Sequence, residues 1–419
     1  MKITHVKARE IYDSRGWPTV QCELYLDNGM ITTASVPAGR SRSHHEAYEL
    51  RDGGKRLNGM GVSKAVEHIE KTIAPALIGK EPNGPTLDIA ILDLDTMPDK
   101  SNLGANAILA VSMAVYKAQA IFEQIELYEL IAYLCGAETI SVPLPQFNMI
   151  NGGVHADNNL PIQEFLVLPV GASSFRSAME IGVTVFHELQ NILRKKGKSI
   201  AVGDEGGFAA QFSGPEEALD YLVTAIEVVG KNEDTRCVIG LDFAASQYYN
   251  TTSTLYTWNN KQLSSLELIE AYQSLLQTYP IYSIEDPLAE DDWVAWQTLM
   301  TACGSEIQII GDDIFATNFY RIEEGIKQGI ANAVLIKPNQ IGTITETLQA
   351  IQLCKQNNIK TIVSHRSGET NETFIADLAV GSSSGQIKAG GCCRGERLAK
   401  YNRLLAIEDA LLETFGSLD

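Results

Sequence analysis

Apolar and polar residues alternate in the early part of the chain. From Val20 to Leu26 every second residue is apolar, and a period of two predicts a strand with one buried face. Asp27-Asn28-Gly29 is typical of a tight hairpin turn, so a further strand is expected over residues 30–35. Mostly helical segments follow to about residue 136. We therefore expect a small α+β domain over residues 1–137, a three-stranded meander followed by helices.

The pattern changes near residue 138. Residues 142–150 and 163–168 are strand-like, and the segment between them is polar and loop-like. A parallel connection usually contains a helix, with about a dozen residues or more in the crossover. The two strands are therefore expected to be antiparallel, unlike the first two strands of a regular barrel.

Two helical segments, residues 173–196 and 215–230, come next. Residues 200–202 between them suit a short strand or a loop, and periodicity does not decide between these. Strands and helices then alternate regularly to the C-terminus. This order predicts an α/β fold, an irregular (β/α)8 TIM-like barrel of ββαα(βα)6 type, over residues 138–419.

Six apolar runs in this second region each end on charged residues. These charges are, in chain order, Asp242, Glu285, Asp312, Lys337, His365 with Arg366, and Lys388. The catalytic groups of TIM-barrel enzymes lie at the C-terminal ends of the parallel strands. Three acids followed by cations therefore predict one site, in which a metal-binding group of carboxylates faces a base.

The three acids offer hard oxygen ligands with no His or Cys close by in the sequence. Such a set suits Mg²⁺, which retains waters and takes further ligands from substrate oxygens. Acids at strand ends also cap helices or pair with arginines, and for any single one of them that structural role is the better interpretation. Three on successive strands, opposite two lysines, favour the metal site.

Lys337 and Lys388 end strands that are otherwise apolar. Each is either an ion-pair partner of the acids or a base. Burial and neighbouring cations disfavour the ammonium form, so Lys337 is expected to have a lowered pKa and to accept a proton. Schiff-base chemistry is the competing use of such a lysine, but it needs no set of metal-binding carboxylates.

Two further segments add chemistry. Glu205 lies on a glycine-flanked turn, and Gln163-Glu164 begins a strand. Taken alone, each is better interpreted as ordinary structure, but a glutamate close to a second carboxylate would have a raised pKa and could act as an acid. Arg366 and Ser367 form a candidate phosphate clamp. Together these groups suit proton abstraction beside a carboxylate, with loss of a leaving group on the opposite face.

Composition restricts the partners. The chain has 419 residues, of which 45% are hydrophobic and 20% charged, and a formal charge of −19, which argues against nucleic acid or an anionic membrane. Residues 1–7 have no continuous apolar core, so no signal peptide is expected. The longest apolar stretch, residues 107–116, is too short to span a bilayer and predicts a buried helix. Seven cysteines without a metal-type CxxC motif indicate reduced thiols in a cytoplasmic protein.

At this point the chain resembles the enolase family, the phosphopyruvate hydratases of glycolysis, nearly from end to end. The motifs that carry the resemblance are Asp13-Ser14-Arg15-Gly16, Gly104-Ala105-Asn106-Ala107, Asn151-Gly152-Gly153-Val154-His155, Gln163-Glu164-Phe165, Gly203-Asp204-Glu205-Gly206-Gly207, Ser283-Ile284-Glu285-Asp286, Gly311-Asp312-Asp313, Asn339-Gln340-Ile341-Gly342, Ser364-His365-Arg366-Ser367-Gly368-Glu369-Thr370 and Ala376-Asp377-Leu378-Ala379-Val380-Gly381. Their order and spacing match the family.

The resemblance implies a role for each candidate residue. It implies two Mg²⁺ ions, the first bound by Asp242, Glu285 and Asp312 and the second by Ser41. It also implies that Lys337 removes the C2 proton of 2-phosphoglycerate while Glu205 and Glu164 assist loss of the C3 hydroxyl. The remaining pocket residues implied are Lys388 for the substrate carboxylate and enolate, Arg366 and Ser367 for the phosphate, and His155, Gln163 and His365 around them. The family forms homodimers or larger rings of dimers.

The loop after Pro37 departs from the family pattern. The chain has Ala38-Gly39-Arg40-Ser41-Arg42-Ser43 where the family usually has Ser-Gly-Ala-Ser-Thr-Gly. One interpretation is a pair of surface arginines with unchanged chemistry. The alternative is an enolase-like paralogue whose arginines meet an additional anionic group on a related carboxylate, for example a phosphonate. A purely non-enzymatic binding role is a third interpretation, and the intact acids and lysines argue against it.

Overall fold

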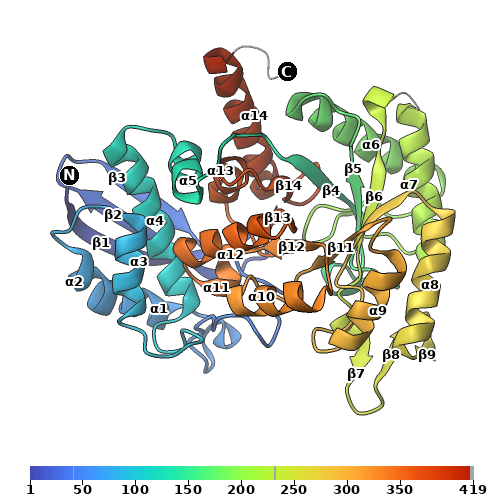
Figure 1. Cartoon of the computed structure of the whole chain (residues 1–419), viewed down its shortest axis with the longest axis horizontal. Coiled ribbons are helices and arrows are strands. Elements are labelled where there is room, and N and C mark those ends of the chain that lie inside the picture. The colour runs from blue at the N-terminus through green and yellow to red at the C-terminus, as the bar shows by residue number, and fades with distance from the viewer. Residues whose placement is uncertain (41, 231–232, 416–419) are drawn as a thin grey trace.

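The computed structural model describes residues 1–40, 42–230 and 233–415. The N-terminal part, blue to teal, lies to one side of a barrel coloured green to red (Figure 1). Helices α11 (Pro338–Ile341) and α12 (Ile344–Gln356) of the barrel face α4 (Ala105–Glu123) of the N-terminal part. The predicted boundary at residue 137 falls between α5 (Leu127–Cys135) and β4 (Leu144–Asn151), and the division into two domains there stays a prediction.

The N-terminal meander has the predicted strands. β1 (Ile3–Tyr12), β2 (Pro18–Leu26) and β3 (Ile31–Ser35) form an antiparallel sheet in that order. The four alternating apolar residues of β2 are fully buried or nearly so. The sheet is followed by short helices, α1 (Ser63–His68), α2 (Ala74–Leu77) and α3 (Gly84–Leu92). The periodicity of two and the hairpin turn were therefore sufficient to predict this sheet.

Helix α4 is the apolar helix expected from the sequence. It is long and apolar enough to cross a membrane by length and composition, with a mean hydropathy of 1.3, but 83% of that window is buried inside the protein. It packs against β2 and β3, so its apolar residues form the core of the N-terminal part rather than a membrane span. The prediction of a buried helix is confirmed.

The barrel closes in the order β4–β5–β6–β10–β11–β12–β13–β14. Its strands after β4 are β5 (Glu164–Leu168), β6 (Val238–Asp242), β10 (Ile281–Glu285), β11 (Gln308–Gly311), β12 (Ala333–Ile336), β13 (Lys360–Ser364) and β14 (Gly385–Lys388). β5 is antiparallel to both β4 and β6, and the other neighbours are parallel. The irregular ββαα(βα)6 barrel and its antiparallel second strand are therefore confirmed.

Helices surround the barrel on its outside (Figure 1). Besides α11 and α12 they are α6 (Phe175–Lys195), α7 (Pro215–Val229), α8 (Ser265–Thr278), α9 (Trp293–Cys303), α10 (Phe319–Gln328), α13 (Phe374–Gly381) and α14 (Gly395–Phe415). Residues 200–202 form no strand of their own, since Val202 makes only an isolated bridge to Phe208. A small sheet of β7 (Tyr249–Asn250), β8 (Leu255–Trp258) and β9 (Lys261–Leu263) was not predicted, because segments of two to four residues carry too little periodicity.

The barrel interior is closed below the site by packed side chains. Ile310, Ala333, Leu335 and Ile362 form a separate apolar cluster. A buried amide chain lies beside it, in which Gln146 Nε2 donates to Gln386 Oε1 at 2.7 Å and Gln386 Nε2 donates to Gln308 at 3.2 Å. Because this interior is filled, the accessible chemistry is restricted to the carboxyl ends of the strands.

Asp88 of α3 joins the N-terminal part to the barrel. Its Oδ2 accepts from the backbone N–H of Thr345 at 3.0 Å and from its hydroxyl at 2.7 Å, at the start of α12. Burial raises the pKa of this carboxyl to about 6, and the hydrogen bonds from Thr345 only partly offset that effect. A raised pKa stabilises the protein fully below the unfolded-state pKa of about 3.9, and this contribution is lost as the pH rises to about 6.

The substitution Asp88→Asn removes this titration but retains an oxygen that accepts from Thr345. We expect the melting temperature of the variant, relative to that of the wild type, to rise between about pH 4 and pH 6. Above pH 6 the difference should stay constant. Thermal unfolding followed by circular dichroism across pH 4–8 measures it, and a difference independent of pH would show that Asp88 does not titrate in this range.

Candidate active site

The barrel topology brings the predicted charges to one end. Asp242, Glu285 and Lys388 are the last residues of β6, β10 and β14, and Asp312, Lys337 and His365 directly follow β11, β12 and β13. Parallel neighbours in a closed barrel share one carboxyl edge, so side chains far apart in the sequence meet there. All six are buried except Lys337, whose side chain is 13% exposed.

Lys388 is the centre of the charged cluster. Its Nζ lies 2.8 Å from Glu285, 3.1 Å from Asp242 and 3.1 Å from Glu164. Burial lowers the pKa of Lys388, but these carboxylates outweigh that effect, so its pKa lies well above the ordinary value. In this arrangement Lys388 is an ammonium ion that neutralises the acids around it.

Lys337 differs from its predicted state. Its Nζ donates to Asp312 Oδ2. Burial lowers the pKa of Lys337, as expected from the sequence. The carboxylates of Asp312 and Glu285 outweigh this effect, and the net pKa lies above the ordinary value. Of the two interpretations left open for Lys337, this arrangement shows the ion pair, and the lowered pKa that a base would need is absent because the nearest charge is a direct carboxylate partner.

Glu164, Glu205 and His155 form the opposite wall of the site. His155 Nδ1 lies 3.6 Å from Glu164 and 3.5 Å from Glu205. Burial and the Glu205 charge raise the pKa of Glu164 well above its ordinary value. Burial also raises that of Glu205, but His155, His365 and Arg397 outweigh it, and its pKa lies well below. The raised pKa predicted for a glutamate beside a second carboxylate thus belongs to Glu164.

His365 orients Glu205. Burial lowers the pKa of His365 to about 4, so its ring is neutral near pH 7. Arg397 Nη1 lies 2.7 Å from His365 Nδ1, and a guanidinium only donates, so Nδ1 accepts and the proton is on Nε2. That Nε2 faces Glu205 Oε2 at 3.4 Å. Arg397 therefore determines the tautomer of His365, in which Nε2–H faces Glu205.

Arg366 and Ser367 lie at the rim where the two parts of the chain meet. Arg366 binds both oxygens of Glu46 at 3.1 Å and donates to Asn339 Oδ1 at 3.0 Å. Ser367 Oγ accepts from Arg15 Nη1 at 3.2 Å and from the backbone N–H of Arg40 at 2.9 Å. The N-terminal part thus supplies a side of the predicted phosphate clamp.

Gln163 lies against the first predicted metal ligand. Its Nε2 donates to Asp242 Oδ2 at 3.3 Å, and its Oε1 accepts from Gln247 Nε2 at 2.8 Å. Ser41, predicted to bind the second metal ion, lies outside the described residues. Glu46, Arg15 and Arg397 were not predicted as site residues. Arg15 lies in the family motif of residues 13–16, but no motif or periodicity in the sequence distinguishes Glu46 or Arg397.

Two cavities open onto these residues. An inner cavity of about 20 Å³ is lined by twelve residues, namely Arg40, His155, Gln163, Glu164, Glu205, Asp242, Lys337, Ser364, His365, Arg366, Ser367 and Lys388. An outer cavity of about 1040 Å³ shares Arg40 and His155 with it and is bordered by Asp204, Gln247 and Arg394. Most of the predicted catalytic and substrate-binding residues therefore line one pocket, whereas Glu285 and Asp312 line neither cavity.

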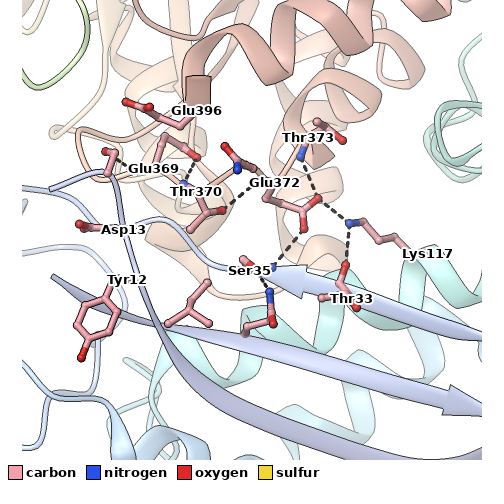
Figure 2. A pocket seen from close by; sticks show the side chains of 14 residues that line it. Tyr12, Asp13, Thr33, Ser35, Lys117, Glu369, Thr370, Glu372, Thr373 and Glu396 are labelled. Atoms are coloured by element: carbon pink, nitrogen blue, oxygen red, sulfur yellow. Dashed lines mark hydrogen bonds and ion pairs between the residues drawn. The ribbon is translucent and has the colours of Figure 1, made fainter. Parts of the chain in front are cut away.

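A third cavity, of about 530 Å³, lies away from this pocket. It is between the N-terminal sheet and residues 369–373, where Lys117 bonds Glu372 at 2.6 Å and the carbonyl of Thr33 at 2.9 Å (Figure 2). These contacts join the sheet to the barrel, and none of the predicted site residues lines this cavity.

The acid set fits a divalent cation. Burial and the nearby Asp242 and Asp312 charges raise the pKa of Glu285 well above its ordinary value, so the three carboxylates lie close enough to repel one another. Neighbouring Asp286 contributes little as a ligand, because its oxygens accept the backbone N–H groups of Asp312 and Asp313. An all-oxygen set of closely spaced carboxylates suits a hard cation such as Mg²⁺.

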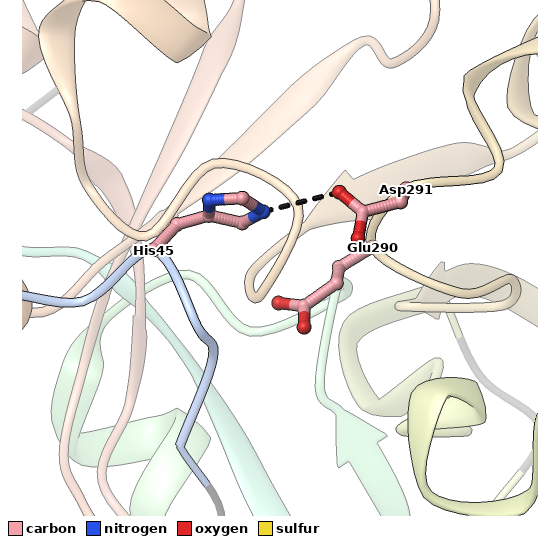
Figure 3. Close-up of side chains that lie close together, drawn as sticks. All are labelled: His45, Glu290 and Asp291. Carbon is pink, nitrogen blue, oxygen red and sulfur yellow. Dashed lines mark hydrogen bonds and ion pairs between the residues drawn. The ribbon is translucent and has the colours of Figure 1, made fainter. Parts of the chain in front are cut away.

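A second group of possible metal ligands lies at the outer edge of the site. His45 Nε2 is 3.1 Å from Asp291 Oδ1, and Glu290 lies beside them (Figure 3). Glu290 also accepts from Ser43 Oγ. These contacts tie residues 43–45 to the loop after β10. A His–carboxylate contact of this kind explains the group without a metal ion.

The fold and site define a TIM-barrel enzyme with a carboxylate group and two lysines at the strand ends. The model described as "Enolase, C-terminal TIM barrel domain" matches residues 139–416, and "Enolase, N-terminal domain" matches residues 3–131. Proteins named "Enolase" from Natranaerobius thermophilus and Mycobacteroides abscessus are 47% and 49% identical over 98% of this chain and 95% and 94% of their own lengths. The chain belongs to the enolase family, and it is an enzyme of the lyase class.

Replacing Lys388 by Met tests its neutralising role. The variant would leave buried carboxylates without their cation, so we expect the metal-free protein to lose about 3–5 kcal/mol of stability. Added MgCl₂ should raise its melting temperature more than that of the wild type, because a divalent cation relieves the same repulsion. The control is Lys360→Met, because Lys360 is the exposed first residue of β13 and lies at the end of the barrel away from the site. Equal Mg²⁺ responses of Lys388→Met and wild type would contradict this role.

Proposed function

We propose that the protein catalyses the reversible, Mg²⁺-dependent dehydration of 2-phosphoglycerate to phosphoenolpyruvate. The observation that carries the proposal is the cluster of Lys337, Lys388, Glu164 and Glu205 at the strand ends, in which Lys388 Nζ lies 3.1 Å from Glu164. A lysine in its neutral amine form suits proton removal beside a carboxylate, a second lysine suits the charge of the enolate, and a carboxyl pair suits departure of a hydroxyl. The names of the relatives support the same reaction.

Asp242, Glu285 and Asp312 are proposed to hold one Mg²⁺ ion, and Ser41 is proposed for a second. A bound Mg²⁺ supplies a Lewis acid for the substrate carboxylate and the charge of its enolate. A cation held by Asp312 would compete with the Lys337 ammonium for the negative charge of that carboxylate. It would thereby weaken the effect that raises the pKa of Lys337 and favour the neutral amine that accepts the C2 proton.

The opposite wall is proposed to supply the proton for the leaving hydroxyl. Glu164, whose pKa is raised, is proposed to carry the proton of the pair, and Glu205, whose pKa is lowered, to be the carboxylate. That proton is delivered toward C3, so that the hydroxyl departs as water. His365 holds Glu205 in place, and His155 lies between the two carboxyl groups.

The remaining pocket residues are proposed to bind the substrate. Lys388 stabilises the substrate carboxylate and the enolate. Gln163 lies beside Lys388, because both side chains donate to Asp242 Oδ2. Arg366 and Ser367 hold the phosphate, since a guanidinium recognises phosphate oxygens in a bidentate manner. We also propose, from the family resemblance, a cytoplasmic location and a homodimeric or larger assembly.

One observation favours a second candidate function. Arg40, which departs from the family pattern, lines the inner cavity beside Ser367. The second candidate is a related dehydration of a more anionic carboxylate, such as a phosphonate. A purified protein that binds Mg²⁺ but does not convert 2-phosphoglycerate would move the assignment to this candidate.

The first experiment is the ultraviolet absorbance rise of the enol phosphate when the protein meets 2-phosphoglycerate and Mg²⁺. We expect turnover in the wild type, no turnover with excess chelator, and a loss of about 10³-fold or more in Lys337→Ala. Lys360→Ala, outside the pocket, should keep the wild-type rate. Turnover that survives in Lys337→Ala would contradict its role as the base.

A further inference from the structure

Arg40 occupies a position that the proposed reaction does not use. Its backbone N–H donates to Ser367 Oγ at 2.9 Å, and its guanidinium Nη1 lies 3.0 Å from Asp204 Oδ2. Arg40 lines both the inner cavity and its mouth. It therefore lies at the entrance to the proposed phosphate position.

Arg40 is the most exposed of the four Lys and Arg side chains that line the inner cavity. Its side chain is 51% exposed, against 13% for Lys337, 4% for Arg366 and 2% for Lys388. The other three are bonded to buried carboxylates. Releasing any of those would leave a buried charge without a partner, which costs several kcal/mol.

The Arg40–Asp204 pair is easier to open. Asp204 is itself 26% exposed, and ion pairs in contact with water contribute little to stability. The loop of residues 203–207 does not depend on this pair alone, because Arg397 Nη2 donates to the backbone carbonyl of Asp204 at 3.0 Å. Arg40 can exchange Asp204 for a stronger anion without loss of that second contact.

Arg42, the other arginine of this loop, is arranged differently. Its guanidinium bonds Glu49, which also binds Arg51, and Arg42 is among the residues of the outer cavity but not of the inner one. The two arginines that the sequence presented as equivalent thus have separate partners, and the inference concerns Arg40.

We propose that Arg40 is a further substrate-binding residue, which exchanges Asp204 for the outer oxygens of the phosphoryl or phosphonyl group held at Ser367 and Arg366. The identity of the substrate rests on the proposed function, but the binding of the dianion does not. A planar guanidinium takes two oxygens of such a group. Arg40 thereby selects substrates whose tetrahedral dianion lies at this end of the pocket.

A purely structural tie between Arg40 and Asp204 is the competing explanation, and two variants separate it from anion binding. Arg40→Ala removes the cation, and Asp204→Asn removes its partner but retains a side chain of the same size. If the pair is only a tie, both variants should weaken anion binding to the same extent. If Arg40 binds the anion, Asp204→Asn should bind it as well as the wild type or more tightly.

The binding measurement is titration calorimetry of inorganic phosphate into the whole protein with chelator present, at constant ionic strength. We expect about 10-fold weaker binding in Arg40→Ala. The control is Arg176→Ala, which removes an arginine from a similarly exposed pair with Asp409 on the outside of the barrel and should bind like the wild type. Wild-type affinity in Arg40→Ala, equal losses in Arg40→Ala and Asp204→Asn, or no phosphate binding by the wild type would each overturn the proposal.

Turnover of 2-phosphoglycerate gives a second readout. Arg40→Ala should raise KM about 10-fold with kcat within about 3-fold, because binding of the phosphate is lost and not the proton transfers. Arg40→Lys should lie between, since it keeps the charge but not the two-pronged donor. A fall in kcat with KM unchanged would overturn the proposal, because it would indicate that Arg40 positions the loop of residues 203–207, which carries Glu205. Absence of turnover in the wild type would contradict the proposed function alone, since the phosphate titration needs no reaction.

Discussion

The barrel brings carboxylates from several strands to one buried end, and their repulsion has to be relieved for the chain to fold. Asp242 and Glu285 are side by side in the register of β6 and β10, and Glu164 is opposite Asp242 in that of β5 and β6. Lys388 contacts all three, and Lys337 pairs with Asp312. Buried charges persist only when paired or bound to a metal, and in this structure the two lysines supply the pairing for these acids.

Burial also affects the pKa values of the two carboxyl groups of Glu164 and Glu205. Two nearby carboxyl groups away from water cannot both ionise easily, and their surroundings decide which of them holds the proton. Glu205 has His365 and, behind it, Arg397, whereas Glu164 lies next to acids and Lys388. The surroundings therefore raise the pKa of Glu164 and lower that of Glu205, which separates the proton affinities of the two groups.

The pocket is completed by the N-terminal part of the chain. Glu46 neutralises the buried guanidinium of Arg366, and Arg15 and Arg40 reach Ser367. The barrel alone would present an anion site with a buried, uncompensated arginine. Glu46 and Arg40 thus contribute to the charge at this end of the pocket, and under our proposal Arg40 affects the anion that the pocket binds without altering the acids and lysines.

The sequence by itself determined the strands of the N-terminal sheet and of the barrel, their order and the ends at which the charges lie, because periodicity and turn chemistry are local, but it did not indicate the small sheet of β7, β8 and β9. It determined the antiparallel β5 from the length and composition of one loop, and it grouped Asp242, Glu285, Asp312 and Lys388 because barrel strands share a carboxyl edge. Only the tertiary structure decided which charges touch. The Lys337–Asp312 contact reversed the direction of a pKa shift, Glu164 rather than Glu205 received the raised pKa, and Arg397 and Glu46 arrived from segments with no local signal. Pairing and burial depend on distances of a few ångströms between residues remote in the chain, and no pattern along the sequence encodes those distances.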